Sequence, residues 1–310
     1  MCTYVPSVDT RPYLRRNPLT GAPLTQLIRT GDGRKLAVEE HGHPDGRPVF
    51  LLHGTPGSRL GQAPRGALLY WLGIRLITFD RPGYGASDRL PGRQVAAVAA
   101  DAAAIADALG IDTFGVVGRS GGAPHALACA ALLPGRTTRA ATLVGLAPRD
   151  GQGLDWFEGM AESNVREYTN AADGLLQVTA ALNLRAVAIR ANPKALVDGL
   201  RGELSNSDRR IVSDTGIQRM LVRNFREALR SSADGWVDDV MAFSTGWGFR
   251  PEAINTPVLL WHGKDDAFAP AEHTRWLAER IPGAYLVVES GAAHFGALEV
   301  LARVLSWAAG

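Results

Sequence analysis

Cysteine is scarce in this chain of 310 residues, which holds only Cys2 and Cys129. Two cysteines this far apart give no disulfide framework and none of the ligand spacings of a zinc site. Cys129 lies in an apolar segment, where a cysteine most simply acts as a small buried hydrophobic residue. We therefore expect no metal centre and no structural disulfide, as in proteins of a reducing compartment.

The chain also lacks an excess of either charge and any long apolar run. Lys and Arg number 33 against 31 Asp and Glu, a net charge of +2. Nucleic-acid and anionic-membrane partners call for concentrated positive charge, so we expect neither. No stretch approaches the roughly 18 apolar residues of a membrane helix, and the first residues contain no signal-peptide core. The expectation is a cytoplasmic protein that binds a small molecule; a homodimer stays open.

Short apolar runs bounded by turn residues alternate with helical segments through much of the chain. After a predicted hairpin over 27–40, the buried strands are expected at 48–52, 75–80, 114–117, 140–146, 257–261 and 284–288. Such runs are typical of strands buried on both faces. Their alternation with helices predicts a mostly parallel sheet that is covered by helices on both sides.

This alternation stops between residues 149 and 249. The segment contains no strong strand run, and its helices are expected at 154–168, 173–190, 193–203, 207–229 and 233–242. Its aromatic residues are Trp156, Phe157, Trp236, Phe243, Trp247 and Phe249. A helical cap over the strand ends would use such side chains to pack and to line a pocket. We predict an N-terminal arm over 1–24, a core over 25–148 and 250–310, and the cap over 149–249.

The most specific local pattern is the turn over 118–122, GRSGG, which follows a predicted strand and precedes a helical segment. The pattern G-x-S-x-G places a serine, here Ser120, at the tip of a sharp strand-to-helix turn. Glycine is needed there because neighbouring backbone comes too close for a Cβ atom. A serine hydroxyl is a poor nucleophile alone, so catalysis would also need a base, an acid and donors to an oxyanion.

Candidates for the base and the acid follow late strands of the predicted sheet. His294 comes after the last strand, and Asp265 and Asp266 come after the strand before it. Adjacent parallel strands would bring these two loops together at the edge of the sheet that carries Ser120. The spacing itself leaves both aspartates open as the acid.

The glycine-rich loop over 53–57, HGTPG, follows another buried strand. If this loop approaches Ser120, the main-chain amides of Thr55 and Gly121 are the natural oxyanion donors. Pro56 has no N–H and is excluded from that role.

Taken together, these segments resemble the motifs of α/β-hydrolase fold enzymes. The matching pieces are HGTPG at 53–57, DRPGYGASD at 80–88, GRSGG at 118–122, GKDDAFAP at 263–270 and GAAHF at 291–295. The resemblance covers nearly the whole chain after residue 24. It implies a mostly parallel eight-stranded sheet with helices on both faces and an all-helical cap inserted after the sixth strand. The family's acid motif falls on Gly263, Asp266 and Pro270, which favours Asp266 over Asp265.

The resemblance implies a serine hydrolase with Ser120, His294 and Asp266 as its triad and Thr55 and Gly121 as its oxyanion donors. The expected substrate is a carboxylic ester, or a related acyl compound, of small or medium size and partly apolar. The reaction would pass through an acyl-enzyme and need no cofactor. Related dehalogenases and epoxide hydrolases carry aspartate at the serine position, so their chemistry is not expected here.

Three alternatives stay open, because fold alone does not select a reaction. One is an aminopeptidase similar to proline iminopeptidases, whose serine turn usually carries a tryptophan where this chain has Arg119 and Gly121. In that case Glu158 and Glu162, which share a helix face, could contact a substrate amine, although a solvated face is the simpler interpretation. Another is a specialised biosynthetic hydrolase or lyase. The last is a ligand-binding member of the fold without turnover.

Overall fold

The structure is a computed structural model that describes residues 24–200 and 202–310. The arm predicted over 1–24 lies outside the described residues except for Leu24. Within the described part, no helix is both long enough and apolar enough to cross a membrane.

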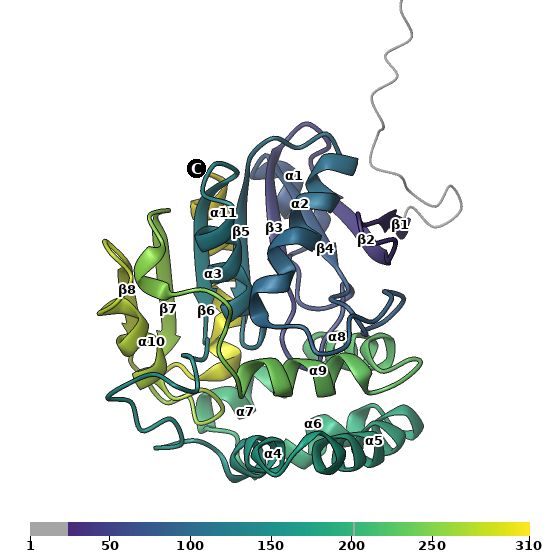
Figure 1. The fold of residues 1–310 in the computed structure, drawn as a ribbon, viewed down its shortest axis with the longest axis vertical. Helices are drawn as coiled ribbons and strands as arrows, with labels where there is room; N and C mark the ends of the chain where they lie inside the picture. The colour runs from purple at the N-terminus through teal and green to yellow at the C-terminus, as the bar shows by residue number, and fades with distance from the viewer. Residues whose placement is uncertain (1–23, 201) are drawn as a thin grey trace, which may run out of the picture.

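One sheet of eight strands, in the order β1-β2-β4-β3-β5-β6-β7-β8, forms the centre of the molecule (Figure 1). The strands are β1 (Gln26–Arg29), β2 (Lys35–Gly42), β3 (Arg47–Leu52), β4 (Ile74–Phe79), β5 (Phe114–Arg119), β6 (Thr137–Leu143), β7 (Val258–Gly263) and β8 (Tyr285–Glu289). Strand β2 pairs antiparallel with both of its neighbours, and every other neighbouring pair is parallel. The predicted mostly parallel, eight-stranded sheet is confirmed.

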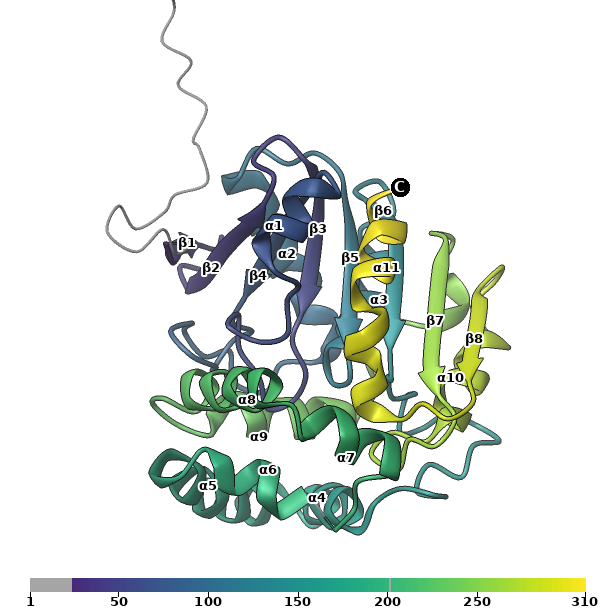
Figure 2. The same cartoon turned by 180° about the vertical axis from the view of Figure 1, so that it is seen from behind.

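Helices cover both faces of the sheet because its central strands are apolar on both sides. In β5, Val116 belongs to the larger core cluster and Val117 to the smaller one, since successive side chains of a strand point to opposite faces. Helices α2 (Val98–Ala108) and α3 (Gly122–Leu132) lie on the first face (Figure 1), and α1 (Gly66–Trp71) and α11 (Ala297–Ala309) on the second (Figure 2). Helix α10 (Ala271–Ala278) packs against β7 and β8.

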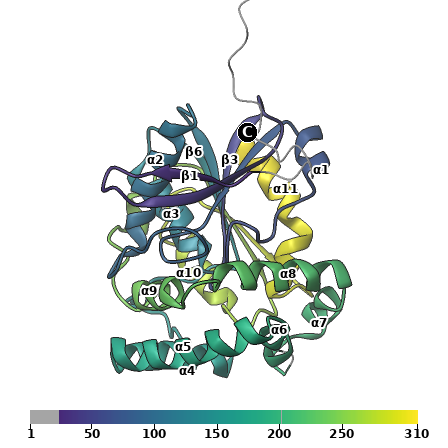
Figure 3. The ribbon, with the colours of Figure 1, turned by 90° about the vertical axis from the view of Figure 1, so that its right-hand side faces the viewer.

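A helical insertion, which we define as α4 to α9, lies between β6 and β7 in the chain. Its helices are α4 (Glu162–Ala172), α5 (Leu175–Ala191), α6 (Lys194–Leu200), α7 (Asn206–Val212), α8 (Thr215–Ala228) and α9 (Asp234–Phe243). It covers the carboxyl ends of the parallel strands in two layers (Figure 3). Helices α8 and α9 lie next to the strand ends, and α4, α5 and α6 lie farther out.

Two of the helix predictions for this segment were wrong. The helix expected over 154–168 begins only at Glu162, because Gly159 adopts a positive φ value that a right-handed helix does not allow. The helix expected over 207–229 is two helices. Asp214 interrupts it by capping α8, where its side chain accepts the Ile217 N–H at 2.9 Å.

Candidate active site

Ser120 lies at the tip of the turn between β5 and α3. Its φ is 53°, in the left-handed region that residues other than glycine rarely adopt. The Ser120 N–H donates to the carbonyl of Leu143 at 2.8 Å. A Cβ atom on Gly118 would collide with the main chain of Gly122, and one on Gly122 with the carbonyl of Leu52. The glycines of the turn are therefore required by close backbone packing, which holds the serine in its strained conformation.

The structure brings His294 and Asp266 into contact. His294 Nδ1 lies 2.8 Å from Asp266 Oδ2, and both side chains are buried. The other carboxylate oxygen accepts the N–H groups of Phe268 at 2.8 Å and Ala269 at 3.1 Å. Burial alone would raise the pKa of Asp266, but the adjacent charge of His294 and the hydrogen bonds of His262 and His294 hold it well below its usual range. Because His294 Nδ1 faces an ionised carboxylate, Nε2 is the nitrogen free to accept a proton.

Asp265 does not reach this pair. It is exposed, and its main-chain N–H donates to the carbonyl of Ala292 at 3.0 Å. A Cβ atom on Gly263 would lie 2.6 Å from main-chain atoms of Ala292 and Ala293. Gly263 thus lets the end of β7 approach the loop that carries His294. This close approach presents the residue after Asp265 to the histidine.

The amides of Thr55 and Gly121 lie next to each other. A Cβ atom on Gly121 would lie 3.2 Å from the Thr55 nitrogen and would collide with the Thr55 hydroxyl. Within the described ranges, neither N–H donates a hydrogen bond. An unpaired main-chain N–H group is rare where it is buried, as Gly121 is, whereas Thr55 is half-buried. Two unpaired N–H groups beside a strained serine offer a place for a negatively charged oxygen.

The remaining histidines that follow strands or lie in nearby helices have structural partners. His53 accepts the Arg81 N–H at 3.1 Å, and His273 accepts the Ala147 N–H at 3.1 Å. His262 contacts the Thr274 hydroxyl at 2.5 Å, and His125 contacts the carbonyl of Val95 at 3.2 Å. None of these contacts leads to Ser120. His53 and His294 both line the serine's pocket, but both ring nitrogens of His53 have main-chain partners, the Gly54 carbonyl at 2.8 Å and the Arg81 N–H at 3.1 Å, which leaves His294 as the candidate base.

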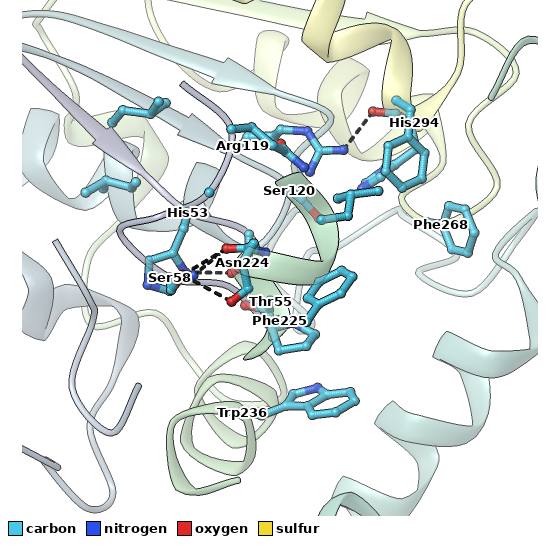
Figure 4. Close-up of a pocket in the computed structure, with 18 of the residues that line it drawn as sticks. His53, Thr55, Ser58, Arg119, Ser120, Asn224, Phe225, Trp236, Phe268 and His294 are labelled. Carbon is cyan, nitrogen blue, oxygen red and sulfur yellow. Dashed lines mark hydrogen bonds between the residues drawn. The ribbon is translucent and has the colours of Figure 1, made fainter. Parts of the chain in front are cut away.

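Ser120 and His294 line a pocket of about 130 Å³ between the strand ends and the helical insertion (Figure 4). Its apolar lining includes Leu221, Phe225, Trp236, Phe268 and Phe295. Of the aromatic residues that we expected to line it, Trp236 does so, whereas Trp156, Phe243 and Trp247 are buried in the core. Trp156, Phe243 and Trp247 therefore stabilise the core and do not face a substrate.

The acidic residue of the helical insertion that lines the pocket is Glu167, which sequence reasoning missed. Its two oxygens accept hydrogen bonds from Trp236 Nε1 at 2.8 Å and Arg185 Nη1 at 2.6 Å. Glu158 and Glu162 do not line the pocket, and Glu162 pairs with Arg166 on the surface at 2.7 Å. The sequence does not identify Glu167, because the residue pattern of α4 does not show which face of this helix lies toward the pocket.

Asp239, on α9, is a second residue that sequence reasoning missed. It is fully buried and reaches the loop of Thr55. One oxygen accepts from the Thr55 hydroxyl at 2.5 Å, Arg81 at 2.5 Å and Tyr84 at 2.8 Å, and the other accepts from Arg93 at 2.6 Å. Burial alone would raise its pKa, but the charges of Arg81 and Arg93 hold it well below its ordinary value. The carboxylate thereby ties the helical insertion to the loop that carries the Thr55 amide.

We expect Asp239→Ala to lower the free energy of unfolding by about 3–5 kcal/mol, because Arg81 and Arg93 then stay buried without a carboxylate. Urea denaturation measures this loss. The matched control is Asp234→Ala on the same helix, whose ion pair with Arg89 is partly exposed and contributes about 1 kcal/mol or less. Equal, small losses for both variants would contradict the role that we assign to Asp239.

Comparison with known proteins places this chain in a family. Residues 47–299 match the sequence model of the alpha/beta hydrolase fold. A non-heme chloroperoxidase of Streptomyces lividans is 29% identical over 286 residues, which cover 90% of this chain and 96% of that protein. A bifunctional esterase/perhydrolase of Acinetobacter calcoaceticus is 25% identical, over 86% of this chain and 92% of that protein.

Among solved structures, an alpha/beta hydrolase fold protein from Nakamurella multipartita aligns with a TM-score of 0.64. Its sequence is 24% identical, and the alignment covers 93% of this chain and all of that one. At this identity the likeness supports the fold. The family match extends from β3 into α11 and spans the serine turn and the loops of Asp266 and His294. The chain belongs to the α/β-hydrolase fold family.

Proposed function

We propose that this protein is a serine hydrolase of carboxylic esters, with Ser120 as nucleophile, His294 as base and Asp266 as the acid that orients the base. The observation that carries the proposal is the 2.8 Å bond between His294 Nδ1 and Asp266. The histidine so oriented shares a pocket with a serine held at a strained turn. A histidine oriented by a carboxylate is the activating pair that a serine nucleophile requires.

In the first half of the reaction, His294 Nε2 takes the hydroxyl proton as Ser120 Oγ attacks the ester carbonyl. The carbonyl oxygen becomes negatively charged and accepts hydrogen bonds from the N–H groups of Thr55 and Gly121, each contributing about 3 kcal/mol in the transition state. The protonated His294 then gives its proton to the leaving alcohol. Cleavage of the ester bond leaves an acyl group on Ser120.

In the second half, a water molecule gives a proton to His294 and attacks the acyl carbon. The bond to Ser120 Oγ breaks, the serine regains its proton from His294, and the carboxylic acid leaves. Asp266 stays ionised throughout and stabilises the charge on the imidazole. The helical insertion supplies the outer wall of the pocket, so we propose that its residues select the substrate.

The names of the relatives agree with this proposal in part, since one of them is an esterase/perhydrolase. A perhydrolase reaction would use the same acyl-enzyme with hydrogen peroxide in place of water. The aminopeptidase alternative is less well supported, because the pocket's Glu167 already accepts hydrogen bonds from Trp236 and Arg185 with both oxygens. A substrate ammonium would have to displace one of them.

A panel of substrates tests the proposal. We expect p-nitrophenyl esters of short acyl chains to be hydrolysed at least 100-fold faster, as kcat/KM, than aminoacyl p-nitroanilides, a margin of about 2.7 kcal/mol. A parallel series with hydrogen peroxide as acyl acceptor measures any perhydrolase reaction. Faster turnover of the aminoacyl anilides would overturn the ester proposal in favour of an aminopeptidase.

A further inference from the structure

Arg119, the residue before the nucleophile, differs from the other buried arginines. Arg59, Arg81 and Arg93 are each buried in an ion pair with a carboxylate, at 2.5 to 2.6 Å. Arg119 is 7% exposed, yet it forms no ion pair with any residue in the described part of the chain. A buried charge without a partner is costly. The fold therefore buries a cation without a carboxylate in direct contact, and Asp266 and Asp208 attract it only from a longer distance.

The contacts of Arg119 leave most of its donors unused. Its Nη2 donates to the carbonyl of His294 at 3.2 Å, and its guanidinium carbon lies 5.2 Å from the ring centre of Phe295. The Nε atom is buried without a partner, and Nη1 makes no hydrogen bond within residues 24–200 and 202–310. Burial lowers the pKa of Arg119 to about 10, so the group stays protonated at neutral pH.

The free side of this guanidinium faces the space beside the nucleophile. Arg119 and Ser120 both line the pocket, and Figure 4 shows them side by side. A Cβ atom on Gly54 would lie 3.4 Å from Ser120 Cβ and 3.8 Å from Arg119 Nη1. Gly54 has no side chain, so the space that a Cβ atom would occupy is open. This space adjoins both the serine and the guanidinium. A substrate bound to Ser120 could place a second group there only through a short linkage.

We infer that Arg119 binds an anionic group of the substrate, so that the preferred substrates are esters bearing a carboxylate a few bonds from the scissile carbonyl. Half esters of short dicarboxylic acids have this form. A guanidinium forms strong, charge-assisted hydrogen bonds with a carboxylate, and Nη1, which adjoins the open space at Gly54, is the donor available here. This inference rests on the ester hydrolase function proposed above and narrows its substrate class.

The test compares anionic with neutral esters of matched length. In the first series, monomethyl succinate is compared with methyl butyrate, and monomethyl glutarate with methyl valerate. In the second series the carboxylate lies on the alcohol side: acyl esters of glycolic acid are compared with ethyl esters of the same acyl group. We expect kcat/KM to favour the carboxylate-bearing ester by about 10- to 100-fold in at least one series, the effect of a hydrogen-bonded charge. In Arg119→Met that ratio should fall to about one or below.

The ratio separates binding of the anion from a structural role of Arg119. Loss of the bond to His294 O would lower turnover of both esters together, and this common factor cancels in the ratio. The control Arg185→Met removes a pocket cation that is already paired with Glu167, and its ratio should stay close to that of the unmodified protein. Thermal unfolding should show Arg119→Met to be folded and no less stable, because an unpaired buried charge is replaced by an apolar chain of similar length.

A binding measurement without turnover completes the test. Titration calorimetry should detect succinate or glutarate binding to Ser120→Ala protein and lose it when Arg119→Met is added. If neutral and anionic esters are both hydrolysed at ratios that Arg119→Met leaves unchanged, the inference about Arg119 is wrong and the ester hydrolase function stands. If no ester of either kind is hydrolysed, the proposed function itself fails.

Discussion

Replacing Ser120 with alanine should lower kcat for ester hydrolysis by about six orders of magnitude, the loss typical of removing a nucleophile that acts as a unit with its base. The variant keeps a Cβ atom in the same turn, so the backbone packing around Gly118 and Gly122 is preserved. Circular dichroism and thermal unfolding should match the unmodified protein. The measurement is steady-state hydrolysis of a short-chain p-nitrophenyl ester with each purified variant.

Replacing His294, the proposed base, provides a control for this prediction. His294→Ala should cost about as much as Ser120→Ala, and the double variant should cost little more, because the two side chains perform one step together. Additive losses would indicate that the residues act separately. Turnover by Ser120→Ala at the level of the unmodified protein would remove Ser120 from the reaction.

Asp266→Asn should lower kcat by about four orders of magnitude with the fold intact, because an amide in place of the carboxylate favours the wrong histidine tautomer. Asp266 Oδ2 faces His294 Nδ1 at 2.8 Å, and its other oxygen is fixed by the N–H groups of Phe268 and Ala269. An amide oxygen can still accept those two N–H groups. The amide NH₂ would then face Nδ1 and donate to it, which moves the imidazole proton to Nε2, the nitrogen that must accept the serine proton.

The matched control is the neighbouring residue. Asp265→Asn changes the same side chain one position earlier, where it is exposed and does not contact His294. We expect its kcat to stay within about twofold of the unmodified protein, as for a surface substitution away from the site. Comparable losses for the two variants would mean that Asp266 is not the residue that orients the base.

The features that the sequence predicts well depend on local rules. The strands around Val116 and Leu260 follow from continuous apolar runs between turn residues, and the serine turn follows from the need for glycine at Gly118 and Gly122. These rules order the sheet and set Ser120 at the ends of its strands. They do not distinguish Asp265 from Asp266, because that choice depends on how closely the end of β7 approaches Ala292.

The features that were missed depend on contacts between distant segments. Asp239 follows another aspartate on an amphipathic helix, a pattern that usually marks a solvated face, yet it is buried against Arg81 and Thr55. The distinctive property of Arg119 is the lack of a direct ion pair within the described residues, and no pattern in a sequence reports a missing partner. Trp156, Phe243 and Trp247 do not reach the pocket for the same reason, since the packing of the segment between β6 and β7 decides which aromatic side chains face it.

Covalent labelling shows directly whether Ser120 is an activated nucleophile. A fluorophosphonate probe should add one adduct to the folded protein, detected by intact-mass spectrometry and located at Ser120 by peptide mapping. The adduct should be absent in Ser120→Ala and strongly slowed in His294→Ala. Folded protein that remains unlabelled, or that is labelled at another residue, would mean that Ser120 is not an activated nucleophile and would favour a member of the fold that binds a ligand without turnover.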